Sequence, residues 1–170
     1  MPGDKVKTLV EHMQALRGSE RPALLAGSME LTYSSLLDRV NTTAELMRDA
    51  GVAADDRVLI IIPNSAEHII AVLAVMAVGA VAVPLDADAG SLRLADVVTQ
   101  TRPRFCLADS GQPVPRGLAT IRIQLADGAI LNCSIEGGAA VAEQRAAPGQ
   151  QLAFIRFTSG STGHAKGVEI

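Results

Sequence analysis

The middle of the sequence alternates short apolar runs with segments of helical periodicity. Runs of strand length occupy 58–62, 80–83 and 104–108, and Pro or Gly bounds most of them. The segments 65–78 and 91–102 lie between these runs and are predicted to be helices. Strands that are apolar on both faces and alternate with helices are typical of a parallel sheet covered on both sides. We therefore predict an α/β domain with a mostly parallel sheet flanked by helices on both faces.

Elements are also predicted on either side of this region. Apolar spacing indicates helices over 4–17 and 34–50, and Gly51 follows the second where a left-handed C-terminal cap is favoured. Gly27 and Ser28 separate two apolar runs, as in a two-residue hairpin turn. Further strands are predicted at 118–125, 130–135 and 152–157.

Polar residues at the ends of these elements are predicted to have structural roles. Ser65 and Ser91 precede helical segments and are candidate N-caps. The pair Asp55 and Asp56 is predicted to be solvated in a turn, and Asp86 to brace the turn after a proline. His12 and His68 lack Cys or carboxylate partners at ligand spacing, so structural or surface roles are expected for them. His164 lies at a loop tip; contact with phosphate is one alternative, and exposure without a dedicated role is the expectation.

Charge and cysteine usage exclude several functions. The net charge of −3 without basic clusters predicts no nucleic-acid partner. The longest uncharged stretch, 69–83, is shorter than the roughly 18 residues of a membrane-spanning helix, so no membrane span is predicted. Cys106 and Cys133 lack metal-ligand spacing and read as small buried hydrophobes; no metal site is predicted. Without an export signal, the expected location is the cytoplasm.

Residues 158–167 carry the chemical information in this chain. Their sequence is Thr-Ser-Gly-Ser-Thr-Gly-His-Ala-Lys-Gly, and it follows a predicted strand. Glycines let backbone N–H groups approach an anion, hydroxyls add short donors, and Lys166 adds a positive charge suited to polyphosphate. A bland Gly/Ser surface loop is the alternative, but it would not need this density of glycines and hydroxyls before a lysine. The segment is predicted to bind phosphate.

Known phosphate-loop and nucleophile patterns do not fit this segment. The Walker pattern G-x-x-x-x-G-K-[ST] fails because Ala165 replaces its second glycine and Gly167 replaces its Ser/Thr. A P-loop NTPase is therefore disfavoured. The dinucleotide pattern G-x-G-x-x-G is also absent, and Ser161 does not lie in a G-x-S-x-G elbow.

The stretch 157–168 closely resembles the signature of the adenylate-forming, or AMP-binding, superfamily. That superfamily comprises acyl- and aryl-CoA synthetases, fatty acyl-AMP ligases, peptide-synthetase adenylation domains and luciferases. Two earlier segments agree in order and spacing: 31–36 resembles its L-T-Y-x-x-L motif, and 78–86 its strand ending in Pro-hydrophobic-Asp. The resemblance is weak over 109–149. Members usually carry proline where this chain has Ala165, which frees φ and restores an N–H.

The resemblance implies that residues 1–170 are the N-terminal part of the family's large N-terminal domain, ending just after the loop 158–167. It implies an ATP-dependent acid–thiol ligase in which the loop holds the β- and γ-phosphates while a substrate carboxylate attacks the α-phosphorus. Acyl-AMP and pyrophosphate form, and the thiol of coenzyme A or of a carrier phosphopantetheine then takes the acyl group. The implied phosphate-binding residues are Thr158, Ser159, Gly160, Ser161, Thr162, Gly163 and Lys166.

The family's other active-site groups lie beyond this loop. They include the adenine-binding segment, the Mg²⁺ ligand, the ribose-binding Asp and the catalytic Lys, so no catalytic residue is expected within 1–170 and the segment alone is predicted to be inactive. ATP, Mg²⁺ and a carboxylic acid are the implied ligands. We favour an acyl-CoA synthetase. The alternatives are an amino-acid-activating adenylation domain of a peptide synthetase, and a non-catalytic or split nucleotide-binding subunit that needs a partner chain.

Overall fold

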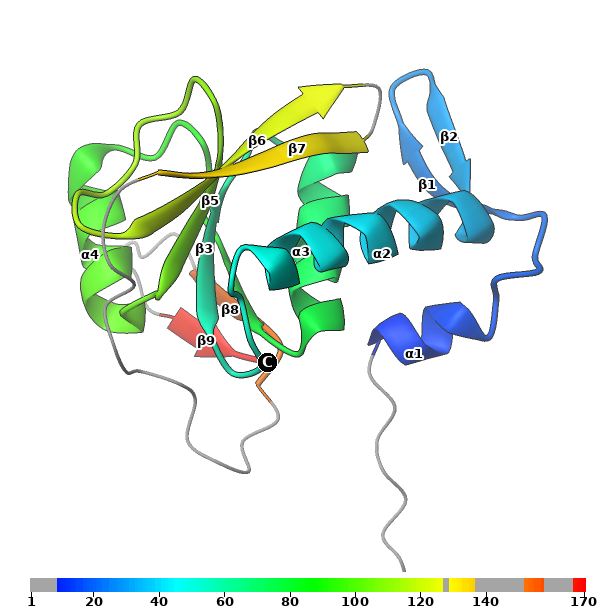
Figure 1. Cartoon of the computed structure of the whole chain (residues 1–170), viewed down its shortest axis with the longest axis horizontal. Helices are drawn as coiled ribbons and strands as arrows, with labels where there is room; N and C mark the ends of the chain where they lie inside the picture. The colour runs from blue at the N-terminus through cyan, green and yellow to red at the C-terminus, as the bar shows by residue number, and fades with distance from the viewer. Residues whose placement is uncertain (1–8, 127–128, 137–151, 158–166) are drawn as a thin grey trace, which may run out of the picture.

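The computed structural model describes residues 9–126, 129–136, 152–157 and 167–170. Four helices and nine strands are found in these ranges (Figure 1). The helices are α1 Leu9–Gln14, α2 Tyr33–Asp49, α3 Ala66–Val78 and α4 Ser91–Thr101. The strands are β1 Pro22–Ala26, β2 Met29–Thr32, β3 Arg57–Ile61, β4 Val81–Pro84, β5 Phe105–Asp109, β6 Ala119–Ala126, β7 Ala129–Glu136, β8 Ile155–Phe157 and β9 Gly167–Glu169.

The central sheet has five strands in the order β4-β3-β5-β6-β7. Strands β4, β3, β5 and β6 are parallel, and β7 pairs antiparallel with β6. In register, Leu59 of β3 lies between Val83 of β4 and Cys106 of β5. At one end of this sheet, β6 and β7 form an antiparallel hairpin. At the other end, β3, β4 and β5 are joined by the helices α3 and α4 in strand–helix–strand units. The prediction of a mostly parallel sheet is confirmed.

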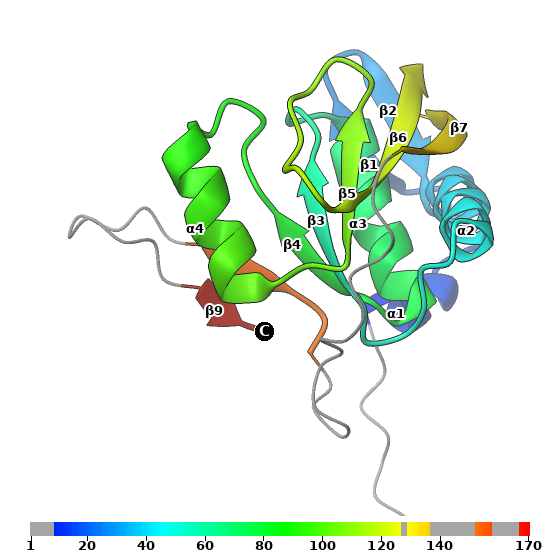
Figure 2. The same cartoon turned by 60° about the vertical axis from the view of Figure 1, so that its left-hand side comes forward.

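Alternate residues of the central strands enter two separate cores. Val58 and Ile60 of β3 face the layer formed by α2 and α3, together with Met47 and Ile70 of those helices. Leu59 and Ile61 face the other side, where α4 contributes Val97. The sheet therefore lies between α2 and α3 on one face and α4 on the other, as Figure 2 shows. Because helices cover both faces of the sheet, the residues on both faces of its central strands are apolar.

Most of the predicted turns and caps are confirmed. Gly27 and Ser28 form the turn between β1 and β2. Gly51 follows α2 with φ +88°, and the Ser65 hydroxyl accepts a hydrogen bond from the backbone N–H of His68 at the start of α3. Ser91 was expected to cap α4, and this is wrong: Gly90 is the N-cap residue, Ser91 is the first helical residue and no side-chain cap bond forms.

The first helix ends earlier than the periodicity predicts. Within the described residues α1 runs from Leu9 to Gln14, and turns follow it up to Gly18. Leu9 and Leu16 are exposed, and only Val10 of α1 is buried. With one buried anchor, the helix gains little packing energy beyond its first turns.

The prediction that Asp56 is solvated in a turn is wrong. Its side chain is 0% exposed, and the Arg104 guanidinium nitrogen Nη1 lies 2.8 Å from Oδ2 and 3.0 Å from Oδ1. The backbone N–H of Ala53 also donates to Oδ2, at 2.9 Å. Asp56 precedes β3 and Arg104 precedes β5, so the pair joins the N-terminal ends of two neighbouring strands.

Replacement of Gly79 by alanine is expected to destabilise the fold. Gly79 ends α3 with φ +84°, and a Cβ there would lie 3.3 Å from the Cβ of Ala54. A left-handed conformation costs an L-residue about 1–2 kcal/mol. We expect Gly79→Ala to lower the free energy of unfolding by at least that amount in urea titrations. Gly18→Ala is the matched control, because Gly18 has no atom within 4 Å of the added Cβ; an equal loss in both variants would contradict the expectation.

Cys106 lies in β5 and is fully buried, as the sequence predicts. Burial raises the pKa of its thiol from 9.0 to about 12, although the positive charge of Arg122 opposes part of this rise. The side chain of Cys133 is outside the described residues. Thiolate is the reactive form of cysteine, so a native thiol with this pKa is on the order of one part in ten thousand ionised at pH 8.

We therefore expect Cys106 to resist alkylation in the folded chain. In a Cys133→Ser background, iodoacetamide at pH 8 should label Cys106 only as fast as the chain unfolds, and urea should release fast labelling. The same pKa shift makes stability depend on pH. The thiol ionises near pH 9 in the unfolded chain and near pH 12 in the native chain. The stability that the protonated thiol contributes to the folded state is therefore complete below pH 9 and is lost as the pH rises through 12. Rapid labelling of Cys106 without urea would contradict the expected resistance to alkylation.

The strand that leads to the predicted phosphate loop is docked on the edge of the central sheet. The backbone N–H of Ala82 in β4 donates to the Ala153 carbonyl at 3.1 Å, and Ala82 and Phe154 form a parallel bridge. β8 then pairs antiparallel with β9, and Phe157 is opposite Gly167. β8 is shorter than the predicted strand 152–157. No helix in the described part of the chain is long and apolar enough to cross a membrane.

Candidate functional site

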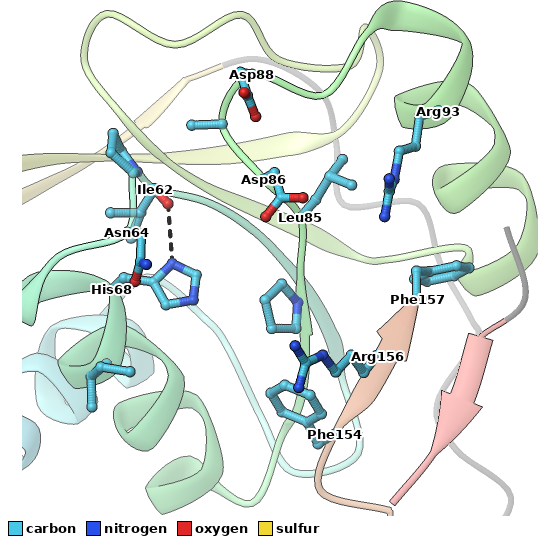
Figure 3. Close-up of a pocket in the computed structure, with 14 residues that line it drawn as sticks. Ile62, Asn64, His68, Leu85, Asp86, Asp88, Arg93, Phe154, Arg156 and Phe157 are labelled. Carbon is cyan, nitrogen blue, oxygen red and sulfur yellow. Dashed lines mark hydrogen bonds between the residues drawn. The ribbon is translucent and has the colours of Figure 1, made fainter. Parts of the chain in front are cut away.

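A cavity of about 680 Å³ lies at the carboxyl ends of β3 and β4 (Figure 3). In α/β folds, ligands bind at this edge of a parallel sheet. The volume is in the range of sites that enclose one small molecule. The lining residues are Ile62, Pro63, Asn64, His68, Ile69, Pro84, Leu85, Asp86, Ala87, Asp88, Arg93, Phe154, Arg156 and Phe157.

Three chain segments meet around the cavity because of the sheet order, and the third of them is 154–157, which includes β8. The loop after β3 and the first turn of α3 supply one wall, with Asn64 and His68. The loop after β4 supplies Asp86 and Asp88, which follow the buried residue Leu85. The backbone carbonyl of Asp86 accepts the hydrogen bond of this turn, from the N–H of Ala89. The carboxylate of Asp86 is therefore not needed for the turn, and it faces the cavity instead (Figure 3).

His68 is held in one orientation. Its Nδ1 lies 3.0 Å from the backbone carbonyl oxygen of Ile62. A carbonyl only accepts, so Nδ1 carries the proton in the neutral ring and Nε2 is left as an acceptor. Figure 3 shows this second nitrogen on the cavity side. The predicted structural role of His68 fits this bond, but the sequence did not indicate that the ring lines a cavity.

Two guanidinium groups face the same cavity from different elements. Arg93 extends from the first turn of α4, and Arg156 extends from β8 (Figure 3). Arg156 is exposed and Arg93 is half-buried. Among the described residues no ion pair joins either arginine to Asp86 or Asp88, although all four line one cavity. The Nε of Arg93 is buried and has no hydrogen-bond partner there.

The sequence-predicted phosphate-binding residues all lie outside the described residues. They are Thr158, Ser159, Gly160, Ser161, Thr162, Gly163 and Lys166. The structure therefore places only the two ends of this segment. Phe157 and Gly167 pair in the β8–β9 hairpin, and Phe157 also lines the cavity. A Cβ at Gly167 would lie 3.2 Å from Ile155, so this position is closely packed.

The polar residues of the cavity were missed by sequence reasoning. Asn64 lies in the loop after β3, Arg93 in α4 and Arg156 in β8; these segments are distant in sequence, and only the strand order brings them together. Arg156 carried one usable signal: it is a charged residue inside a strand whose neighbours, Ile155 and Phe157, are buried. Within the ranges that the structure describes, no group of three His, Cys, Asp or Glu side chains could hold a metal ion.

Comparison with known proteins gives the chain a family context. Residues 12–170 match the family described as AMP-binding enzyme. Phenyloxazoline synthase MbtB of Mycolicibacterium paratuberculosis is 38% identical over 164 residues, which cover 92% of this chain and 13% of the synthase.

Solved structures agree with the fold. The N-terminal subdomain of Klebsiella oxytoca NpsA superposes with a TM-score of 0.76 at 26% identity, over 98% of this chain and 42% of that one. NpsA-ThdA, an artificially fused adenylation–PCP di-domain NRPS from Klebsiella oxytoca, superposes with a TM-score of 0.65 at 25% identity, over 69% of this chain and 23% of that one. The chain thus spans less than half the length of each of these proteins.

Proposed function

Because the chain belongs to the AMP-binding enzyme family, we propose that it is the N-terminal part of an adenylation domain that activates a carboxylic acid with ATP. In this reaction a carboxylate oxygen bonds to the α-phosphorus and the bond between the α-phosphorus and the bridging oxygen breaks. The products are acyl-AMP and pyrophosphate. Activity requires groups beyond this chain, so it is proposed for a parent protein of which these residues are one part.

The observation that carries this proposal is the setting of the segment 158–166. Its ends are fixed by the pairing of Phe157 with Gly167, and the hairpin is bonded to the β4 edge of a parallel sheet. The cavity at the carboxyl ends of β3 and β4 reaches Phe157. A donor-rich segment attached beside a cavity of this kind suits phosphoryl transfer, which depends on positioning and charge stabilisation.

We propose the following roles for the loop. The hydroxyls and backbone N–H groups of 158–163 hold the β- and γ-phosphates, and the Lys166 ammonium neutralises the charge that pyrophosphate gains as it leaves. The assigned side-chain donors are Thr158, Ser159, Ser161 and Thr162, with Gly160 and Gly163 allowing close backbone approach. Mg²⁺, bound by a carboxylate elsewhere in the parent protein, would supply further charge neutralisation. A cytoplasmic location stays a prediction.

The comparisons favour a peptide-synthetase adenylation domain over the acyl-CoA synthetase preferred from sequence. The similar solved di-domain is an NRPS adenylation domain fused to a PCP. We therefore propose that the activated acid passes to the phosphopantetheine thiol of a carrier protein, and coenzyme A is no longer the expected acceptor. The acid itself is an amino acid or an aryl acid in this proposal.

A substrate panel tests this proposal. Purified parent protein would be assayed for ATP–pyrophosphate exchange with each of the amino acids, with hydroxybenzoic and aminobenzoic acids, and with fatty acids. We expect exchange with one member of the first two groups, followed by acyl transfer to a carrier protein. Exchange with fatty acids alone and transfer to coenzyme A would return the assignment to acyl-CoA synthetase. No exchange with any acid would support a non-catalytic subunit.

A further inference from the structure

We propose that Arg93 and Arg156 form a subsite that receives pyrophosphate as it leaves the active site. The inference rests on the proposed function, because that reaction produces the pyrophosphate. It adds two residues, from α4 and β8, that lie outside the loop motif and have no assigned role. Both side chains face the cavity at the carboxyl ends of β3 and β4 (Figure 3).

Both guanidinium groups are available to a ligand. Arg156 is exposed, and among the described residues neither arginine has a carboxylate within ion-pair distance. By contrast, Arg104 and Arg122 each bind a carboxylate within 3.0 Å. The Nε of Arg93 is buried, and among the described residues it has no hydrogen-bond partner. The Arg93 side chain is therefore not fixed by a hydrogen bond at this atom.

The chemistry of the two side chains points to a phosphate group. A guanidinium presents a planar fork of N–H donors that matches two oxygens of one phosphate. Two such forks on different elements suit an anion with two phosphate groups. Arg156 also lies two residues before Thr158 in the chain, so the subsite adjoins the segment proposed to hold ATP phosphates.

Acidic groups in the same cavity limit how tightly an anion is held. Asp86 and Asp88 carry negative charge there, so they repel phosphate and reduce its affinity for the cavity. The Nε2 atom of the neutral His68 ring offers no donor to phosphate oxygens. Weak binding suits a product that must leave, whereas a substrate site would gain from stronger retention. The arrangement therefore favours a transient position for pyrophosphate.

Calorimetric titration of the 170-residue chain with inorganic pyrophosphate tests the subsite directly. We expect Arg93→Ala and Arg156→Ala each to weaken pyrophosphate binding at least ~10-fold, the usual lower limit for loss of a charged hydrogen bond. Asp86→Asn should tighten binding, a change that unfolding cannot imitate. Arg21→Ala, which removes an equal charge from an exposed position outside the cavity, should leave it unchanged. Unchanged affinity in both cavity arginine variants, or no pyrophosphate binding by the wild-type chain, would overturn the proposal.

Kinetics of the parent protein separate this inference from the proposed function. Arg156→Ala should raise the KM for pyrophosphate in the exchange assay more than the KM for ATP, and Arg156→Lys should restore part of the loss. If exchange proceeds and both KM values stay at wild-type levels, the subsite is wrong and the adenylation function stands. If the parent protein shows no exchange at all, the function fails, and the calorimetric comparison alone then decides whether the arginines bind pyrophosphate.

Discussion

Replacing Asp56 with alanine is expected to lower the free energy of unfolding of the chain by about 3–5 kcal/mol, the usual cost of removing one member of a buried ion pair. The carboxylate is fully buried and accepts hydrogen bonds from Arg104 and from the backbone of Ala53. Its loss leaves an N–H and part of a guanidinium without their acceptor. Arg104 is 27% exposed, so water recovers some of this cost and the lower end of the range is expected.

Asp38→Ala is the matched control for this measurement. Asp38 pairs with Arg17 at 2.7 Å, which is as close as the buried pair, but the two side chains are 41% and 63% exposed for Arg17 and Asp38 respectively. Exposed pairs contribute about 0–1 kcal/mol. Urea titration followed by far-ultraviolet circular dichroism should therefore separate the two variants by at least ~2 kcal/mol. Equal losses would mean that Asp56 is as solvated as the sequence first suggested.

Replacing Lys166 with alanine in the parent protein should slow ATP–pyrophosphate exchange by about 10- to 150-fold, equivalent to 1.5–3 kcal/mol for one charge-assisted hydrogen bond to phosphate. The loop contains one cation beside four hydroxyls, so no neighbour within 158–167 replaces its charge. Most of the loss should fall on kcat, because the charge on the leaving pyrophosphate grows in the transition state.

Lys7→Ala removes the same charge outside the motif and should leave exchange unchanged. Lys166→Arg keeps the charge and should retain part of the rate. Circular dichroism of each variant would show that the fold is intact. An exchange rate for Lys166→Ala equal to that of the wild type would remove Lys166 from the phosphate role without affecting the assignment of the fold.

Local sequence was enough to predict the elements of this fold that depend on burial. β3 after Arg57 and the whole of β4 are apolar runs because both faces of the sheet are covered, and Ser65 and Gly79 mark the ends of α3 by the chemistry of caps. One error was a shift of a helix boundary by one residue. Ser91 was predicted to be the N-cap of α4, but the chain enters α4 one residue earlier, at Gly90.

Asp56 and the cavity show what local reasoning lacks. Asp56 was predicted to be solvated and Arg104 was only the first residue of a predicted strand, and the two are brought together because the strand order places β3 beside β5. In the same way, Arg93 and Arg156 lie 63 residues apart in the numbering, and only the docking of β8 on β4 brings both to one cavity. The phosphate loop was the opposite case: its residue types and spacing carried the prediction without any tertiary information.

Transfer of isotopic oxygen tests the adenylation chemistry most directly. The parent protein would be supplied with ATP, a carrier protein and its carboxylic acid labelled with ¹⁸O in the carboxyl group. If a carboxylate oxygen attacks the α-phosphorus, thiol transfer cleaves the acyl–oxygen bond and leaves one ¹⁸O atom in the phosphate of AMP. Mass spectrometry should then find labelled AMP and unlabelled pyrophosphate. Formation of ADP together with ¹⁸O-labelled inorganic phosphate would show attack at the γ-phosphorus instead and would contradict the account.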